Sequence, residues 1–423
     1  MDARTDQPSP KDPQSPIAGR RAQSATPAAK VLRHPGWAVA AVLLIAFNLR
    51  PSITTVALFI ADIKHDLGLS TLGLSVLTML PVICLGLFAP FAPVLARRFG
   101  IETVMAVSLV GVAIGSVLRS YGVAPLFLGT VIIGASLCFL GVLSPVVVKR
   151  DFPHRIGLMM GVYTMLVCVG PALAAATAVP FRHVLGGSWE LVLLIWGLPC
   201  LVGAIAFIPQ LFQNKDVGDD VAPARPVGLM REPLAWQVTG YFALITALAY
   251  AVFNWGPTML EARGLDAASS GLVLSLCYVG QTIAGLLAPI VAGRQSDQRP
   301  IVIAVVLLTA AGLVGFVYAP VWSLDIVALV LGVGQGGAFG VALLLFALRT
   351  RDAQSAARLS AMAQTVGYIL GGVIGPFAVG VIYDWTGSWP IVSVFYVAVG
   401  AASLLLGIGA GRARFVAAPA AVS

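Results

Sequence analysis

Twelve stretches of about twenty apolar residues follow one another along this chain of 423 residues, and they constrain its fold more than any other feature. A helix of that length crosses the hydrocarbon core of a bilayer. With 58% hydrophobic and only 10% charged residues, the chain has too few polar side chains to cover a water-soluble fold of this size. We therefore predict an all-α membrane protein with twelve transmembrane helices. The expected spans are residues 37–60, 70–95, 101–118, 124–148, 155–180, 189–212, 234–259, 267–293, 301–319, 322–348, 358–383 and 389–410.

Short motifs recur in order at an offset of 199 or 200 residues, which indicates two parallel repeats. Repeats of this kind are typical of secondary transporters with a binding site at the midplane between the halves. We predict six-helix bundles at residues 37–212 and 233–411, joined by a cytoplasmic linker at 213–232. The matching pairs are Trp37 with Trp236, Gly86-Leu-x-Ala-Pro90 with Gly285-Leu-x-Ala-Pro289, Lys149 with Arg349, and Gly187-Ser-Trp189 with Gly387-Ser-Trp389.

The basic residues are distributed unevenly between the two sides of the predicted bundle. If both termini are cytoplasmic, 21 of the 26 Lys and Arg residues lie on that side, and Arg50 lies inside a span. The four in loops on the other side are Lys64, Arg119, Arg182 and Arg263. The positive-inside rule therefore favours cytoplasmic termini. Residues 1–36 are rich in Pro, Ser, Ala and Arg, which predicts a disordered cytoplasmic tail, and residues 412–423 form a second tail.

Arg50 lies about midway along the first span, in the sequence Phe47-Asn-Leu-Arg-Pro51. An arginine at the centre of a bilayer costs roughly 2.5–3.5 kcal/mol on insertion scales, so it is expected to face a polar cavity or a partner. Pro51 lacks an amide hydrogen and restricts the residue before it, which predicts a kinked helix at this point. We expect Arg50 to contact a substrate. The structural alternative is pairing with carbonyls freed by the kink or with Asp384.

Amide and phenol side chains in several other spans are candidates for the same site, because such groups can orient a small anion by hydrogen bonds. Each of them has an alternative role as an interhelical hydrogen bond, which is common in membrane bundles. Three pairs at helical spacing are expected to share one inward face: Tyr250 with Asn254, Gln364 with Tyr368, and Tyr278 with Gln281. The candidate binding residues besides Arg50 are Asn48, Tyr163, Tyr250, Asn254, Gln281, Gln335 and Gln364.

Other functional classes lack support in the sequence. All four histidines lie in the tail or loops, and no metal-ligand spacing, Walker loop or nucleophile elbow is present. We predict no enzyme activity, no cofactor, no metal site and no nucleic-acid partner. No Asp, Glu or His lies near the middle of a predicted span, so any proton coupling runs through the substrate or through peripheral acids. Uniport and anion exchange remain open.

Twelve spans in two repeats, with Arg97-Arg-Phe-Gly100 between the second and third spans, resemble the major facilitator superfamily from Trp37 onward. That resemblance implies a monomer that works by alternating access. We assign Arg97, Arg98 and Arg294 to its cytoplasmic gating loops. Arg97 stands where the superfamily motif usually has an acid, so the charge relay often given to that loop is not expected here.

A narrower resemblance rests on Asn48-Leu-Arg-Pro51, on Asp62-Ile-x-x-Asp66-Leu-Gly-Leu-Ser70 and on Lys149-Arg-Asp-Phe-Pro153. These motifs are similar to those of the cyanate and 2-nitroimidazole transporter family. The resemblance implies a carrier in the bacterial inner membrane for a small anionic or polar solute, cyanate-like, nitro-aromatic or a small carboxylate. Gly170-Pro171 and Gly375-Pro376 resemble part of a drug-antiporter motif, so efflux is the alternative, with a membrane receptor third.

Overall fold

The computed structural model describes residues 35–213 and 229–416, and every regular element within these ranges is a helix. The predicted tail at 1–36 and the linker at 213–232 lie almost wholly outside the described residues, as does the end of the tail at 412–423. The first half of the chain comprises α1 (Pro35–Asn48), α2 (Pro51–Leu58), α3 (Ile60–Leu67), α4 (Thr71–Leu87), α5 (Phe91–Phe99), α6 (Ile101–Leu118), α7 (Val123–Asp151), α8 (Ile156–Val184), α9 (Trp189–Ile195) and α10 (Leu198–Gln213).

The described part of the second half begins with a single 3₁₀ turn, η1. One segment of it, η3, has π-helical geometry. The elements are η1 (Leu229–Arg231), α11 (Pro233–Glu261), α12 (Ala267–Arg294), α13 (Arg299–Tyr318), η2 (Val321–Ser323), α14 (Leu324–Leu348), α15 (Ala353–Val366), η3 (Gly367–Ile374), α16 (Gly375–Thr386) and α17 (Trp389–Gly411).

All twelve predicted spans are helical in the described residues, although they differ in length and continuity. Nine helical stretches there are individually long and apolar enough to cross a membrane. A tenth is the pair α4 and α5, which bend by 60° relative to each other around Phe88–Pro90. The first and sixth spans contain only shorter apolar helices, at Val42–Val56 and Trp189–Ile205.

The first span is interrupted at Arg50, as the sequence predicts. α1 ends at Asn48 and α2 begins at Pro51, and Arg50 precedes α2 with φ −124° and ψ −24°. The Arg50 carbonyl accepts hydrogen bonds from the amides of Ile53 (3.0 Å) and Thr54 (3.1 Å). Pro51 has no amide hydrogen to continue the α1 ladder, so the backbone changes direction where the charged side chain begins.

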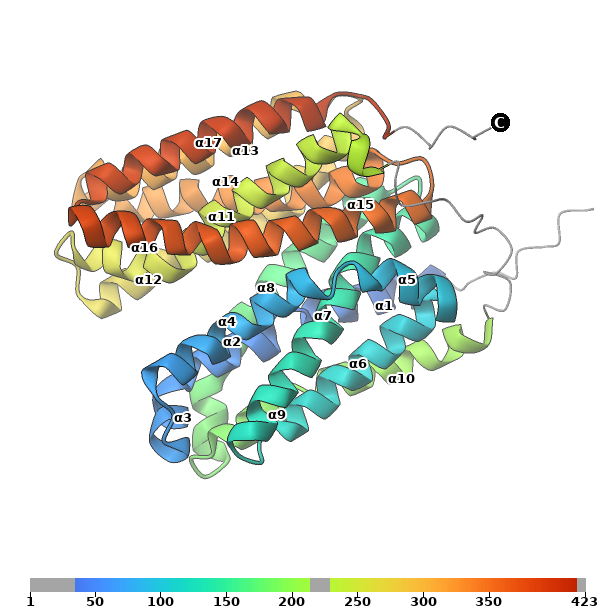
Figure 1. Cartoon of the computed structure of the whole chain (residues 1–423), viewed down its shortest axis with the longest axis horizontal. Coiled ribbons are helices and arrows are strands. Elements are labelled where there is room, and N and C mark those ends of the chain that lie inside the picture. Colours follow the sequence, from blue (N-terminus) through green and yellow to red (C-terminus); the bar gives the residue numbers. More distant parts are fainter. Residues whose placement is uncertain (1–34, 214–228, 417–423) are drawn as a thin grey trace, which may run out of the picture.

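The helices form two bundles, with α1–α10 in one and α11–α17 in the other (Figure 1). The bundles meet where α8 packs against α12 and α14, and where α4 and α5 pack against α15 and η3. These are equivalent spans of the two repeats, which gives the interface its approximate two-fold symmetry. The limits predicted for the bundles, residues 37–212 and 233–411, are not tested by these contacts and stay a prediction.

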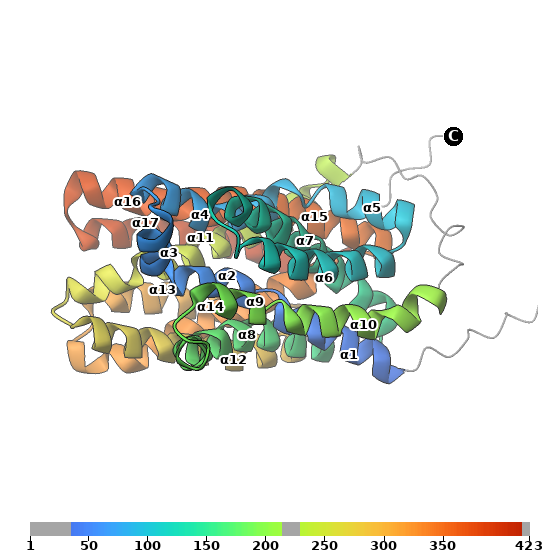
Figure 2. The same ribbon diagram turned by 90° about the horizontal axis from the view of Figure 1, so that it is seen from below.

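The bundle has two ends, seen at opposite sides of Figures 1 and 2. We call the end that carries the loops around Gly100, Phe152, Gln295 and Arg349 the basic end. The opposite end carries α3 and loops that contain glycines with positive φ, among them Gly122 (101°), Gly187 (91°) and Gly264 (91°).

Within the second bundle, glycines let α12 and α14 approach until their backbones touch. A Cβ atom on Gly332 would lie 2.0 Å from the Cys277 carbonyl oxygen, and one on Gly336 would lie 2.2 Å from that of Gln281. Such close approach gives membrane helices van der Waals attraction that lipid contacts do not provide. This pair therefore forms a closely packed wall on the second bundle's side of the interface.

We expect Gly332→Ala to destabilise the protein, because the added methyl group overlaps the backbone of α12. Overpacking of this kind costs about 1–3 kcal/mol. Gly271→Ala on α12 is the matched control, since a Cβ there meets nothing within 4 Å. Thermal unfolding of both purified variants in detergent measures the difference. Equal midpoints for the two variants would contradict the close-packing account.

Candidate functional site

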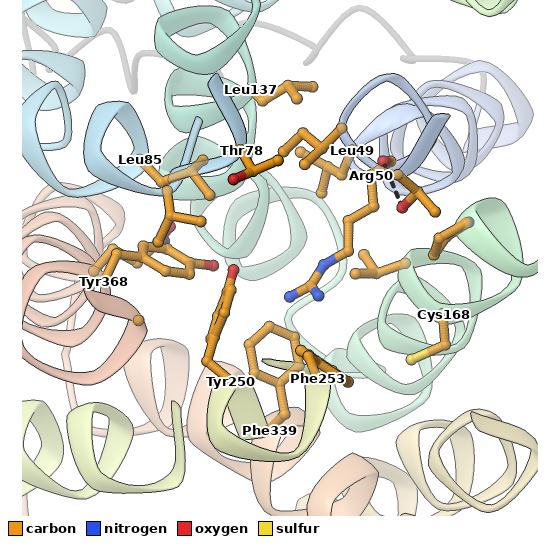
Figure 3. Close-up of a pocket in the computed structure, with 18 of the residues that line it drawn as sticks. Leu49, Arg50, Thr78, Leu85, Leu137, Cys168, Tyr250, Phe253, Phe339 and Tyr368 are labelled. Carbon is orange, nitrogen blue, oxygen red and sulfur yellow. Dashed lines mark hydrogen bonds between the residues drawn. The ribbon is translucent and has the colours of Figure 1, made fainter. Parts of the chain in front are cut away.

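A cavity of about 520 Å³ lies between the two bundles and takes residues from both (Figure 3). Near the opposite end its lining residues Leu58 and Tyr278 are 46% and 44% exposed. Nearer the basic end, Leu343 and Gln364 are 4% and 2% exposed. The cavity is therefore open toward the opposite end and closed toward the basic end.

Arg50 extends from the break between α1 and α2 into this cavity (Figure 3). Its guanidinium carbon lies 5.6 Å from the centre of the Phe339 ring on α14, so a cation–π contact reaches the other bundle. Within the described ranges the guanidinium group has no hydrogen bond or ion pair to the protein. Its donors are therefore available to a bound solute or to water.

Aromatic side chains from both bundles line the cavity that holds the guanidinium group. Tyr163 comes from α8, Tyr250 from α11 and Tyr368 from η3, and the hydroxyl groups of Tyr250 and Tyr368 point toward each other across the cavity (Figure 3). Phe253 stacks on Tyr278 with ring centres 5.8 Å apart. The lining thus combines flat apolar surfaces with phenol groups that can donate hydrogen bonds.

A single positive charge sets the electrostatics of the described cavity lining. Among the described residues that line it, Arg50 is the one charged side chain, and none is Asp, Glu or His. An arginine stays protonated at any physiological pH. The cavity therefore attracts a single negative charge or a strongly polar group, and it repels cations.

Five of the predicted binding residues line the cavity: Arg50, Tyr163, Tyr250, Asn254 and Gln364. Asn254 is exposed at the mouth and donates to the Tyr250 carbonyl (2.7 Å). The Gln364 amide nitrogen donates to Ser360 Oγ (2.9 Å), and the amide oxygen takes no part in this bond. These residues share the cavity, and their role in binding stays a prediction.

The other three predicted residues, Asn48, Gln281 and Gln335, are not among those that line the cavity. Gln281 Nε2 donates to Gln335 Oε1 (3.1 Å), and Gln335 Nε2 donates to the Leu248 carbonyl (3.4 Å). Asn48 donates to the Leu44 carbonyl and accepts from the Cys200 thiol. Buried amides need such partners, so these three residues connect neighbouring helices.

The expected shared face of Tyr278 and Gln281 is wrong for the same reason. Tyr278 lines the cavity, whereas Gln281 turns to α14. Residues three apart on a helix differ by about 60° in direction. α12 presents only a narrow face to the cavity, so Tyr278 lies on that face and Gln281 does not. Sequence reasoning also missed Phe339, since an apolar residue in an apolar span gives no signal until its neighbours are known.

At the basic end, one lysine links the two bundles. Lys149 Nζ, at the end of α7, donates to the Ala347 carbonyl (2.8 Å), to Thr350 Oγ1 (2.7 Å) and to the Thr350 carbonyl. These acceptors lie at the end of α14, where helix carbonyls have no partner within the helix. Lys149 therefore caps a helix of the other bundle and holds this end closed.

The predicted gating residues Arg97, Arg98 and Arg294 are exposed at the same end. Arg98 lies over the neighbouring Phe99 ring at 5.3 Å. Within residues 35–213 and 229–416, no ion pair connects any of the three to the other bundle. Their role in gating stays a prediction, and the observed polar link is Lys149.

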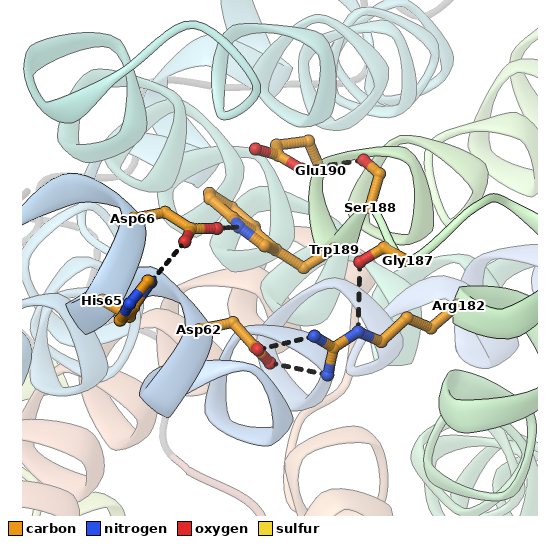
Figure 4. Close-up of polar contacts among 8 residues, drawn as sticks. All are labelled: Asp62, His65, Asp66, Arg182, Gly187, Ser188, Trp189 and Glu190. Atoms are coloured by element: carbon orange, nitrogen blue, oxygen red, sulfur yellow. Dashed lines mark hydrogen bonds and ion pairs between the residues drawn. The ribbon is translucent and has the colours of Figure 1, made fainter.

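The opposite end carries a polar cluster that joins α3 to the start of α9 and the end of α8 (Figure 4). Arg182 forms a bidentate ion pair with Asp62 (2.7 and 3.0 Å). Asp66 accepts a hydrogen bond from Trp189 Nε1 (2.9 Å) and contacts His65 Nδ1 (2.9 Å). The Asp66 carboxylate raises the pKa of His65, and the His65 contact lowers the pKa of Asp66.

The sequence profile of the Major Facilitator Superfamily matches residues 40–376. This chain belongs to the major facilitator superfamily. It is a multi-pass membrane transporter and not an enzyme, and its all-helical fold is the one that its sequence predicts.

Three curated superfamily members are similar over most of the chain. The uncharacterized transporter YycB of Bacillus subtilis (strain 168) is 35% identical over 90% of this chain and 94% of its own. The 2-nitroimidazole transporter of Escherichia coli (strain K12) is 32% identical over 88% and 95%. The cyanate transport protein CynX of the same organism is 29% identical over 82% and 90%. The predicted resemblance to this transporter family is confirmed.

Solved structures of the superfamily have the same fold. The proton:xylose symporter XylE aligns with a TM-score of 0.74 at 12% identity, over 90% of this chain and 97% of its own. The fucose:proton symporter FucP of E. coli aligns with a TM-score of 0.67 at 13% identity, over 89% and 99%. At such low identity the likeness shows the architecture alone.

The polar cluster predicts how the transporter's His65 titrates. We expect the His65 pKa to lie above its ordinary value of 6.5, and to return toward it in Asp66→Asn, because the variant removes the carboxylate that stabilises the imidazolium. The contact stabilises the fold while His65 is protonated and Asp66 is ionised, and this contribution is lost as the pH rises through the raised pKa of His65 or falls through the lowered pKa of Asp66. NMR titration of the histidine ring measures both values. Identical pKa values in the two proteins would contradict the contact.

Proposed function

We propose that the transporter moves a small, flat anionic or polar solute across the bacterial inner membrane by alternating access, with Arg50 as its anchor. The observation that supports this proposal is the position of Arg50 in a cavity between the two bundles, where its guanidinium group has no hydrogen bond or ion pair to the described residues and lies over the Phe339 ring. A charge at that depth is stable only beside water or a counter-ion. A bound anion supplies the counter-ion.

The shape and lining of the cavity favour a solute with a ring. About 520 Å³ is far more than a triatomic anion such as cyanate fills, and it lies within the usual range for ligand pockets. Tyr250, Phe253 and Phe339 offer flat surfaces on which a planar group can stack. A nitro-aromatic compound or an aromatic carboxylate fits this combination, and the relative named as a 2-nitroimidazole transporter supports that choice.

We infer the orientation from the charged loops. Among the described residues, the basic end carries most of the Lys and Arg side chains, and the positive-inside rule assigns it to the cytoplasm. The described chain starts and ends there, which is consistent with cytoplasmic termini (Figure 1). In this orientation the cavity opens to the periplasm, and Lys149 closes the cytoplasmic side.

Efflux is the second candidate function, and the composition of the lining is what favours it. Met79, Phe253, Phe339 and several aliphatic residues contribute most of the cavity wall, as expected for an exporter of apolar compounds. The guanidinium group argues for an anionic or polar cargo in either case. Transport measured in both directions separates uptake from efflux.

We expect Arg50→Gln to reduce transport of benzoate, cyanate and 2-nitroimidazole by about 10- to 100-fold, because hydrogen bonds to a charged group contribute roughly 1.5–3 kcal/mol. Arg50→Lys keeps the charge and retains part of the activity, since a point charge replaces the planar fork. Uptake into proteoliposomes, with neutral benzamide as the uncharged counterpart of benzoate, measures both effects. Arg155→Gln is the exposed-arginine control. Wild-type flux of all three solutes in Arg50→Gln would exclude the anchor role.

We expect Lys149→Met to open the basic end more often, because it removes the hydrogen bonds that join α7 to α14. The free energy lost with a charged hydrogen-bond donor predicts that reagents reach the closed interface from the basic end about tenfold faster. The measurement is the labelling rate of a cysteine introduced by Ser360→Cys. Ser360 is fully buried at the closed interface, where its hydroxyl donates to the Val142 carbonyl (3.1 Å), so a thiol there is labelled only when this end opens. Arg155→Met, an exposed residue of the adjacent loop, is the control. Equal thiol labelling in both variants would contradict a latch.

A further inference from the structure

A second guanidinium group is buried in the first bundle, behind Arg50. Arg119 follows the last residue of α6 and is 1% exposed. Its Nη1 donates to the Ser52 carbonyl (2.6 Å), and its Nε donates to Thr130 Oγ1 on α7 (3.0 Å). No carboxylate among the described residues pairs with it, and its Nη2 has no partner.

Burying the Arg119 charge costs free energy, and the side chain could avoid that cost by extending into water. Arg119 follows the C-terminus of α6, at the end of the molecule away from the basic end. A long side chain there can extend toward the membrane surface and keep its charge in water. Instead the side chain turns into the bundle and passes against Gly129 of α7, where a Cβ would lie 3.1 Å from Arg119 Cγ. A buried unpaired charge costs several kcal/mol, so the contact with Ser52 is expected to have a function.

The contact is made where the first span is weakest. Ser52 lies two residues after Arg50, in the first turn of α2, which has eight residues and no side-chain cap at its start. The break at Arg50 removes the continuity that would orient α2 through α1. A charged donor fixed to α6 and α7 therefore sets the position of the turn that carries Arg50.

We propose that Arg119 is a positioning residue of the candidate site: it holds the Ser52 carbonyl, and so directs the Arg50 side chain into the cavity. The inference rests on the proposed function, in which Arg50 meets the solute. Thr130 completes the support, because its hydroxyl accepts from Arg119 Nε and itself donates to the Leu126 carbonyl (2.7 Å). Arg119 does not touch the solute.

Cys168 provides a measurement that needs no knowledge of the solute. It lines the cavity near Arg50 and is partly exposed, whereas Cys84, Cys138, Cys200 and Cys277 are buried. In a protein that keeps Cys168 alone, the labelling rates of a negatively charged and a positively charged methanethiosulfonate are compared. Their ratio reports the electrostatic potential in the cavity, and changes in thiol reactivity cancel.

We expect this ratio to fall about tenfold in Arg50→Gln, which corresponds to ~1.4 kcal/mol. In Arg119→Gln it falls to roughly a third to a tenth of the wild-type value, because a misdirected Arg50 no longer dominates the cavity. Thr130→Val is the milder variant if Arg119→Gln does not fold, and it lowers the ratio in the same direction. Arg119→Lys recovers part of the ratio, since it restores one donor.

Arg263→Gln is the matched control, because Arg263 also donates to backbone carbonyls at the same end, those of Phe316, Val317 and Ala319 in the other bundle. It is expected to leave the ratio unchanged. A wild-type ratio in Arg119→Gln and Thr130→Val, or an equal fall in Arg263→Gln, would overturn the inference. If Arg50→Gln lowers the ratio but leaves anion transport intact, the proposed function fails instead.

Discussion

The constraint on which the rest of this structure depends is a permanent positive charge in the first transmembrane span that has no hydrogen bond or ion pair within the described residues. A guanidinium group inside a membrane needs protein acceptors or water, and Arg50 has no such acceptors among the described residues, so it requires the cavity beside it. The helix must also break to present the side chain, and Pro51 supplies the break. The broken helix then needs support from its neighbours, and Arg119 and Thr130 provide a rigid point behind it. The cavity and its supporting contacts thus follow from one unfavourable charge.

The two repeats use equivalent cations differently, and this difference closes one end of the cavity. Lys149 and Arg349 occupy matching positions at an offset of 200 residues. Arg349 donates to the carbonyls of Ala410 and Gly411 within its own bundle, whereas Lys149 donates to carbonyls of the other bundle. Neutral acceptors bind a cation less tightly than a carboxylate does, which suits a contact that must open in every transport cycle. The two repeats thus carry a cation at equivalent positions, and only the one on α7 joins the two bundles.

Close backbone contacts at the bundle interface suit the same motion. A Cβ on Gly157 of α8 would lie 2.6 Å from the Pro289 carbonyl oxygen of α12, and Gly293 approaches Gly157 equally closely. Smooth surfaces of this kind hold helices together without interlocking side chains, so that one bundle can rock against the other. The polar cluster at the opposite end joins only helices of the first bundle, which keeps that bundle rigid while the interface changes (Figure 4).

By itself, the sequence determined the architecture of this protein. A bilayer requires about twenty apolar residues per span and penalises any charge within it, so twelve spans, two repeats, the break at Pro51 and the prominence of Arg50 are all visible in one dimension. Only the tertiary structure decided which polar residues share a space. Asn48, Gln281 and Gln335 looked like Tyr250 and Gln364 in sequence, yet they bond to neighbouring helices, because a helix turns 100° per residue and small rotations move an amide from a cavity to an interface. The same holds for Arg119, which sequence reasoning assigned to a loop on the far side of the membrane and the fold buries beneath the first span.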